Sequence, residues 1–226
     1  MSASSADRPQ RAGPGATELR VLCGLVLAAL LASGIAPHDR GTWLLEVAPV
    51  LIGLPLALLL HRRRPLTALL WRLLALHALI LIVGGHWTYA RVPAGDWLKD
   101  ALGLARNPYD RLGHLAQGFV PALLVRELLL TRTPLRPGAC LFFLVTAAAL
   151  AFSACYELIE WAAALVLGRG ADDFLGTQGD PWDTQWDMFM ALVGAASAQL
   201  LLDRAQDREL ASALDARCLP TTRPTR

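Results

Sequence analysis

Hydrophobic positions along the chain gather into six long blocks separated by short polar stretches. The blocks lie at about 19–35, 43–60, 66–84, 112–130, 139–167 and 182–202. At 1.5 Å of helical rise per residue, blocks of roughly 17–29 residues match a hydrocarbon core of about 30 Å. Backbone amides in lipid need partners within the segment, and the blocks lack the alternation of barrel strands. The pattern therefore predicts an all-α, polytopic membrane bundle of six transmembrane helices.

Composition supports a membrane environment. Of the 226 residues, 54% are hydrophobic and 18% are charged, so the chain is more apolar than an ordinary soluble domain. The net charge of +2 comes without a basic patch typical of nucleic-acid binding. The four cysteines have no metal-type spacing. We expect the lipid bilayer as the surroundings, no nucleic-acid partner, and neither a disulfide framework nor a zinc knuckle.

The basic residues are distributed unevenly between the two sides of this six-helix arrangement. Most of the 21 Arg and Lys residues, including the HRRRP stretch at 61–65, fall on the side of the termini. The opposite side receives only Arg40, Arg91, Lys99, Arg106, Arg111 and Arg169. Because cytoplasmic loops carry the excess of positive charge, both termini are predicted to be cytoplasmic. The loops at 85–111 and 168–187 then face the periplasm or exterior.

The sequence divides into three regions. Residues 1–18, rich in Ser, Ala, Pro, Gly and Arg, are expected to form a disordered cytoplasmic leader. Residues 19–202 form the transmembrane domain, and 203–226 form a cytoplasmic tail that begins as a short helix.

Ionisable residues recur near the outer ends of the last three blocks. The fourth block opens with YDRLGHLAQG, in which Asp110 and His114 are one helical turn apart. The fifth carries Glu157 and Glu160 on one helical stripe, and the sixth carries Asp183 and Asp187. An ionised carboxylate at membrane depth costs roughly 2.5–3.5 kcal/mol even on the lenient insertion scale. These groups are therefore expected to face one another across the bundle.

Several polar residues have simpler interpretations. Asp180 is predicted to be the N-cap of the last helix, with Pro181 at its first position. Arg126 and Glu127 are expected to snorkel to the cytoplasmic interface, and Glu46 to remain in water at the outer start of its helix. The outer polar pocket is expected to include five further residues, namely His86, Tyr89, Tyr109, Gln117 and Tyr156.

A histidine surrounded by carboxylates offers hard ligands for a divalent metal ion such as Mg²⁺, Mn²⁺ or Ca²⁺, and for Zn²⁺ if a second histidine joins. The candidate metal ligands are Asp110, His114, Glu157, Glu160, Asp183 and Asp187. The candidate catalytic residues are His114, Glu157, Glu160, Asp110 and Arg111. Compensation by nearby arginines or by protonation of the carboxylates stays open as an alternative to a metal.

These motifs carry a family resemblance. The stretches GGHWTYARVP (84–93), NPYDRLGHLAQGFVPALLVRELLL (107–130), YELIEW (156–161) and ADDFLGTQGDPWDTQWDM (171–188) resemble the YjdF-type bacterial inner-membrane proteins, a multi-pass family of unknown function. The order Asp-basic-x-x-His, an intramembrane Glu, and an Asp-rich start of the last span is also similar to VanZ-like membrane proteins. That second likeness implies a shared centre at Asp110, Arg111, His114, the Glu157/Glu160 pair and the Asp183/Asp187 pair.

Three classes of function are compatible with this pattern. The first is a metal-assisted or acid-base activity on a lipid-linked or cell-envelope substrate that enters from the outer leaflet. The second is a small ion- or proton-coupled transporter. The third is a structural or regulatory membrane subunit in which the ion pairs only lock the helices together. The sequence does not decide whether the chain is an enzyme.

Overall fold

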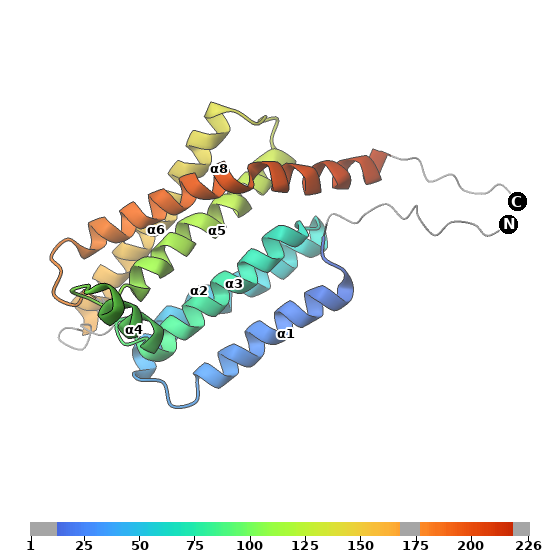
Figure 1. Ribbon diagram of the computed structural model, residues 1–226. Coiled ribbons are helices and arrows are strands. Elements are labelled where there is room, and N and C mark those ends of the chain that lie inside the picture. The colour runs from blue at the N-terminus through green and yellow to red at the C-terminus, as the bar shows by residue number, and fades with distance from the viewer. Residues whose placement is uncertain (1–12, 168–176, 219–226) are drawn as a thin grey trace, which may run out of the picture.

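The computed structural model describes residues 13–167 and 177–218, and within them it is helical without strands (Figure 1). The helices are α1 (Ala16–Ser33), α2 (Arg40–Arg63), α3 (Ala68–Trp87), α4 (Pro93–Leu102), α5 (Tyr109–Arg132), α6 (Ala139–Leu167) and α8 (Asp183–Cys218). The predicted all-α class is confirmed. Most of the expected leader, the loop residues 168–176 and the end of the tail lie outside the described residues.

The six long helices run back and forth beside one another, and the short α4 lies at one end of the bundle (Figure 1). The start of α1 and the end of α8 both lie at the other end. Among the described helices, α1, α2, α3, α6 and α8 are long and apolar enough to cross a membrane. The remaining long helix, α5, has 24 residues but carries polar side chains along much of its length.

The bounds of α8 differ from the predicted last span in both directions. The helix begins at Asp183 rather than at Pro181, because the carboxylate of Asp180 accepts the backbone N–H of Trp182 at 2.9 Å and holds a turn there. It continues beyond residue 202 to Cys218. Residues 203–218 contain neither Gly nor Pro and are rich in strong helix formers, so nothing interrupts the backbone hydrogen bonding.

The helix α4 was not predicted from the hydrophobic pattern, which indicated a continuous outer loop at 85–111. Its local signals are nevertheless present in the sequence. Pro93 stands at the first position of the helix, and Gly103 ends it with a φ of 63°. Proline at the start and a left-handed glycine at the end are the expected asymmetry of a short helix.

The closest helix packing in the bundle is between α5 and α8. A Cβ on Gly118 would overlap the carbonyl oxygen of Ala191, and one on Gly194 would overlap that of Leu115. Small residues permit this approach, as is common where helices meet inside membranes. The approach brings the polar residues at the start of each helix close together.

The far end of α5 is held by a buried polar network. Glu127 accepts hydrogen bonds from the backbone N–H and the hydroxyl of Thr67, at 2.9 and 2.7 Å. Arg126 donates to Gln206 at 3.0 Å and pairs with Asp207 at 2.8 Å. Arg126 is 4% exposed and Glu127 2% exposed, so the snorkelling interpretation was wrong. The start of α3 and the extension of α8 cover these side chains instead.

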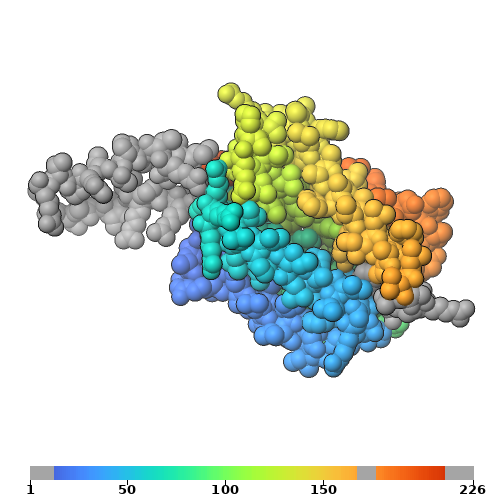
Figure 2. All heavy atoms as spheres, turned by 180° about the vertical axis from the view of Figure 1, so that it is seen from behind, coloured from blue at the N-terminus to red at the C-terminus, as the bar shows by residue number. Residues whose placement is uncertain are grey.

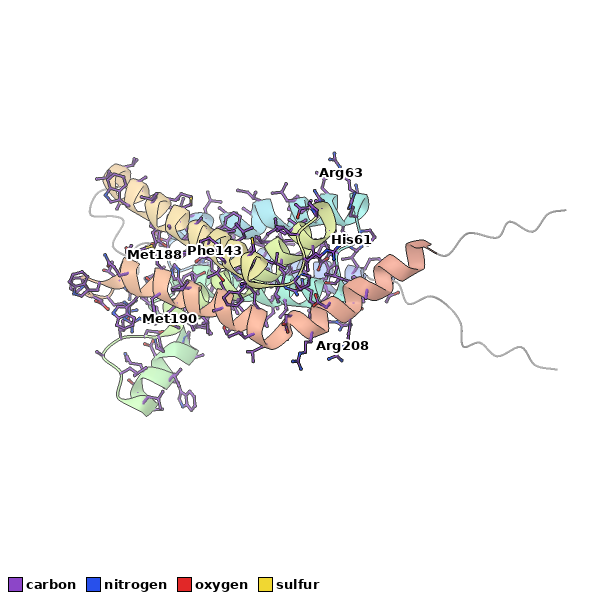
Figure 3. The ribbon with its side chains drawn as sticks, turned by 90° about the horizontal axis from the view of Figure 1, so that it is seen from above. His61, Arg63, Phe143, Met188, Met190 and Arg208 are labelled. Carbon is purple, nitrogen blue, oxygen red and sulfur yellow. The ribbon has the colours of Figure 1, made fainter. Side chains whose placement is uncertain are left out.

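Basic residues lie near this same end of the bundle. Figure 3 places His61 and Arg63 at the end of α2 and Arg208 on the extension of α8, away from Met188 and Met190 in the first turns of α8. The carboxylate-rich turns of α5 and α8 therefore lie at the opposite end from these basic side chains.

Candidate functional site

The candidate site begins at the first turns of α5, whose start is fixed by Asn107. The side-chain oxygen of Asn107 accepts the N–H of Tyr109 at 3.0 Å, and its amide donates to the carbonyl of Val92 at 3.0 Å. Its backbone exchanges hydrogen bonds with the side chain of Gln178, at 2.9 and 3.1 Å. The residues before α5 are thus tied both to the start of α4 and to the segment that precedes α8.

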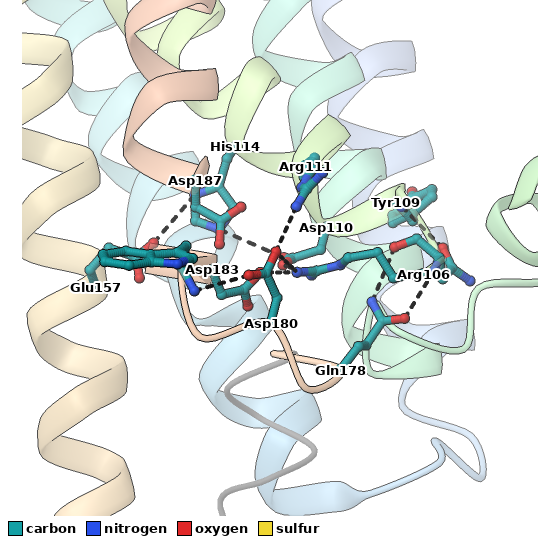
Figure 4. Close-up of polar contacts among 12 residues, drawn as sticks. Arg106, Tyr109, Asp110, Arg111, His114, Glu157, Gln178, Asp180, Asp183 and Asp187 are labelled. Carbon is teal, nitrogen blue, oxygen red and sulfur yellow. Dashed lines mark hydrogen bonds and ion pairs between the residues drawn. The ribbon is translucent and has the colours of Figure 1, made fainter. Parts of the chain in front are cut away.

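His114 lies at the centre of a group of carboxylates from three helices (Figure 4). Its Nε2 is 3.6 Å from Oδ1 of Asp110, one turn earlier on α5, and 4.0 Å from Oδ2 of Asp187 on α8. Its Nδ1 is 3.7 Å from Oε1 of Glu157 on α6. The predicted convergence of these helices is present in the structure.

Asp110, His114 and Asp187 form a compact buried triad. One ligand atom from each residue lies within 4.8 Å of the other two, and the three residues are 8%, 5% and 3% exposed. Oxygen ligands of one cation lie at roughly 2.0–2.6 Å from it, so two of them are separated by about 5 Å at most. The three donor atoms therefore lie within the separation that the ligands of one Ca²⁺-sized cation can span, and a smaller cation would need them to move closer together.

Some polar atoms of the centre have no protein hydrogen-bond partner among the described residues. They are Nδ1 of His114, Oε1 of Glu157 and Oδ1 of Asp187. Buried polar atoms are usually satisfied, so each such atom calls for a partner such as an ion, water or ligand. Nδ1 of His114 and Oε1 of Glu157 face each other at 3.7 Å, so one water or ion between them would satisfy both, whereas Asp187 faces Nε2 on the other side of the ring.

Two arginines hold the outer side of the centre. Arg106 pairs with Asp183 and with Asp110, the second pair at 3.3 Å. Burial opposes the charged form of Arg106, yet the carboxylates of Asp183 and Asp110 raise its pKa above the usual value. Arg111 pairs with Asp180 at 2.9 Å and lies over the ring of Trp186, 5.2 Å from its centroid. These contacts offset part of the negative charge.

A small cavity of about 50 Å³ adjoins His114, and Asp187 is not among its lining residues. Its polar lining comes from Glu46, His77, Tyr89, Asp110, His114, Gln117, Tyr156 and Glu160. Glu46 is 5% exposed and accepts the hydroxyl of Tyr156 at 3.0 Å, so the expectation that it stays wet was wrong. The ends of α3 and α6 cover it. Burial also raises the pKa of Tyr89 well above its usual value, so its phenol stays protonated.

The structure assembles most of the predicted polar pocket. Tyr89, Gln117 and Tyr156 line the small cavity. His86 instead contacts the carbonyl oxygen of Ser33 on α1, with Nδ1 at 2.8 Å, and Tyr109 donates to the carbonyl of Ile80 at 3.0 Å. These two residues support the neighbouring helices and do not line the cavity.

Sequence reasoning missed three residues of the centre. Arg106 was named only as one of three arginines that could compensate the carboxylates, Glu46 was placed in water, and His77 was not included in the predicted pocket. Periodicity shows which face of one helix is polar, but the partner across the bundle follows from tertiary packing. For Glu46, the only local sign of a buried role was a carboxylate near the start of an apolar block.

These features define the class of protein. A helical bundle with five candidate membrane spans, whose buried charged groups converge at one end, is an integral membrane protein. The chain belongs to the family described as predicted membrane protein (DUF2238), whose profile matches residues 18–208. This result confirms the resemblance to the YjdF-type proteins.

A relative of this chain is named as an inner-membrane protein. Inner membrane protein YjdF of Escherichia coli (strain K12) is 56% identical over 181 residues, which cover 80% of this chain and 87% of that protein. No solved structure gives a significant match. The likeness to VanZ-like proteins stays a prediction.

Proposed function

We propose that the chain crosses the inner membrane six times. In this proposal α5 is a membrane span in addition to the five candidate spans α1, α2, α3, α6 and α8. A helix of 24 residues is about 36 Å long, enough to span the hydrocarbon core. Its polar residues Asp110, His114, Arg126 and Glu127 are buried against other helices, which removes the main obstacle to insertion. In this proposal residues 1–18 and 203–226 are a cytoplasmic leader and tail, and 19–202 form the membrane domain.

In this topology the carboxylate–histidine centre faces the periplasm. The excess of arginine near the opposite end supports this orientation through the positive-inside rule. A periplasmic site beside the outer leaflet is accessible to lipid-linked and cell-envelope substrates. The proposed function follows from this placement together with the chemistry of the centre.

The function we propose is divalent-cation-dependent or acid-base chemistry on such a substrate. The observation that carries it is the spacing of Asp110, His114 and Asp187, whose donor atoms lie within 4.8 Å of one another. A bound ion would supply positive charge and lower the pKa of a coordinated water. With one histidine and two carboxylates in the triad, Mg²⁺ or Mn²⁺ suits the donor set better than Zn²⁺.

The other residues of the centre have distinct proposed roles. Glu157 is the candidate general base, because its Oε1 faces His114 without a hydrogen-bond partner among the described residues. Glu160 lies on the small-cavity side and is the alternative base or ligand. Asp183 is a ligand candidate that is held by Arg106, and Arg111 is the candidate contact for an anionic group.

The position of His77 favours a second candidate, an ion- or proton-coupled transporter. His77 of α3 lines the small cavity together with Asp110 and His114, so a polar group is present deeper in the membrane than the triad. In the third class, a structural or regulatory subunit, the ion pairs would serve stability alone. These classes differ in whether the centre binds a cation.

Elemental analysis of protein purified in detergent tests the proposal. The wild type, grown and purified with Mg²⁺, Mn²⁺ or Zn²⁺ supplied, is expected to retain one equivalent of cation. Asp187→Asn and His114→Ala should weaken binding by more than the roughly 10–100-fold that loss of an outer-shell partner costs. Asp100→Asn, the same type of change at an exposed position of α4, should bind as the wild type does.

Two results would contradict the proposal. One is a wild-type protein that holds no cation under any of the three supplies and whose melting temperature none of them raises. The other is equal cation content in Asp187→Asn and Asp100→Asn. If His114→Ala and Asp187→Asn both fail to fold while the wild type holds no cation, the structural class is supported.

A further inference from the structure

A large apolar cavity lies directly beneath the polar centre. Its volume is about 520 Å³, within the range of about 300–1,000 Å³ typical of ligand pockets. Side chains of α1, α2, α3, α5 and α6 line it, and nearly all of them are aliphatic or aromatic. The polar exceptions, His77, Gln117 and Tyr156, also line the small cavity beside His114. The walls of the two spaces therefore share these three residues, together with Pro49 and Leu81.

The length of this cavity is about that of one leaflet of a bilayer. Along α5 its lining extends from Gln117 to Leu128, a helical rise of about 16 Å. The hydrocarbon core is about 30 Å thick, so the cavity covers about half of it. It runs from below the polar centre past the middle of the α5 block, which is predicted at 112–130, towards the cytoplasmic ends of the helices.

The cavity opens sideways between α2 and α6. Leu56 of α2 and Phe152 and Ile159 of α6 line it and are 52%, 56% and 54% exposed. Figure 2 shows this face, where α2 and α6 lie on either side of a furrow. At the end near the polar centre, the hydrogen bond from Tyr156 to Glu46 joins α6 to α2. A chain can therefore enter from the bilayer below that bond.

The junction between the two spaces offers a hydrogen bond to a ligand. The buried Nε2 of His77 has no hydrogen-bond partner among the described residues. Gln117 lines both spaces beside it. A hydroxyl, ester or phosphate oxygen at the boundary between a headgroup and a chain would satisfy such groups.

We propose that this cavity binds one hydrocarbon chain of a membrane lipid, whose headgroup then lies at the Asp110–His114–Asp187 centre. The proposal rests on the proposed function and adds the substrate class, a long-chain amphiphile that enters laterally between α2 and α6. The side chains shared by the two spaces, the length of the apolar cavity and its lateral opening each support it. A water-soluble substrate would require neither the cavity nor the opening.

Photocrosslinking in vesicles tests this proposal. The probe is a phospholipid with a diazirine near the end of one acyl chain, present as a small fraction in phosphatidylethanolamine–phosphatidylglycerol vesicles that contain the full chain. Peptide mapping is expected to concentrate the label on the cavity-lining faces of α2, α5 and α6. Inward-facing residues such as Leu124 and Val125 of α5 should be labelled, although they are only partly exposed.

A matched pair of glycine variants separates the cavity from the general lipid surface. Gly53 lines the cavity and Gly24 does not, and an added Cβ at either position would meet no atom within 4 Å. Gly53→Leu fills the cavity and should lower labelling of the α5 lining by about tenfold, equivalent to about 1.4 kcal/mol. Gly24→Leu adds the same side chain outside the cavity and should leave the labelling unchanged.

Equal labelling of α5 in these two variants, or wild-type label confined to lipid-facing residues, overturns the proposal. The Asp187→Asn variant distinguishes this failure from that of the proposed function. Loss of cation with retained labelling of α5 shows that the two sites are separable and both real. A wild type that labels α5 but holds no cation supports the lipid cavity and removes the metal chemistry.

Discussion

At the scale of single residues, the polar centre depends on charge balance as much as on spacing. Buried carboxylates from α5, α6 and α8 face one another, and Arg106 bridges two carboxylates from the preceding loop. Breaking a buried ion pair by removing one partner costs about 3–5 kcal/mol, because the remaining charge is left uncompensated. Arg106 therefore affects the stability of the whole centre.

Arg106→Gln is expected to lower the free energy of unfolding by about 3 kcal/mol at neutral pH. Asp110 and Asp183 lose their counter-ion, and only protonation can relieve the repulsion, so the deficit should shrink as the pH falls. Melting temperatures in detergent between pH 5 and pH 8 measure this.

The double variant Arg106→Gln/Asp183→Asn provides the control. It removes one of the two uncompensated carboxylates and should recover part of the lost stability. If the double variant is less stable than Arg106→Gln alone, charge compensation is not the role of Arg106.

At the scale of helices, the contact between α5 and α8 places Asp110 and His114 opposite Asp187. That contact depends on glycine, because a Cβ at Gly118 would overlap the backbone of α8. Elsewhere in a helix, replacing glycine by alanine stabilises by about 0.5–1 kcal/mol. Whether a glycine-to-alanine substitution stabilises or destabilises the protein therefore reports whether two helix backbones are in contact at that position.

Gly118→Ala is expected to destabilise the protein by about 1–3 kcal/mol, because α8 must move away from α5. It should also weaken cation binding, since Asp187 moves with α8. Gly53→Ala, at an open position of α2, should be neutral or slightly stabilising. Thermal unfolding of both variants in one detergent measures the difference, and a stabilising effect of Gly118→Ala would contradict the observed helix contact.

At the scale of the whole molecule, the orientation in the membrane decides which substrates can reach the centre. The six long helices alternate in direction, and the two ends of the bundle differ in charge. Most arginines lie towards the end with the starts of α1 and α3, whereas α4 and the polar centre lie at the other end. Only a periplasmic position of that second end agrees with the proposed envelope substrate.

Fusions to a phosphatase that needs disulfides test this orientation, because disulfides form outside the cytoplasm. A fusion after Arg64 is expected to be inactive, and a fusion after Gly103, between α4 and α5, is expected to be active. A cytoplasmic reporter at the same two positions should give the opposite pattern. Activity of the phosphatase after Arg64 would overturn the topology and the periplasmic site together.

Much of the fold could be predicted from the sequence, because membrane helices are selected by local physics. Unpaired backbone groups are not tolerated in lipid, so long apolar blocks must be helices whatever their neighbours are. The helices α1, α2, α3 and α6 agree with the predicted blocks to within a few residues. The helix α4 was missed because its ten residues do not form an apolar block.

The candidate site was predictable only in part. The stripes on α5, α6 and α8 indicated that Asp110, His114, Glu157 and Asp187 face inward, and the structure brings them together. Glu46 is buried by contact with Tyr156, and Arg106 pairs with Asp183. Both contacts join residues far apart in the sequence, so no local sequence pattern predicts them. The same holds for Arg126 and Glu127, which are buried because α8 continues past the predicted span.

By itself, the sequence determined that this is a helical membrane protein, where most of its helices lie and which faces are polar. These properties follow from hydropathy and helical periodicity, which act over neighbouring residues. The tertiary structure alone decided that donor atoms of Asp110, His114 and Asp187 lie within 4.8 Å of one another, that Arg106 pairs with Asp110 and Asp183, and that an apolar cavity shares side chains with the small polar one. Those properties depend on how far apart helices lie and on what fills the space between them, which packing of the whole bundle determines.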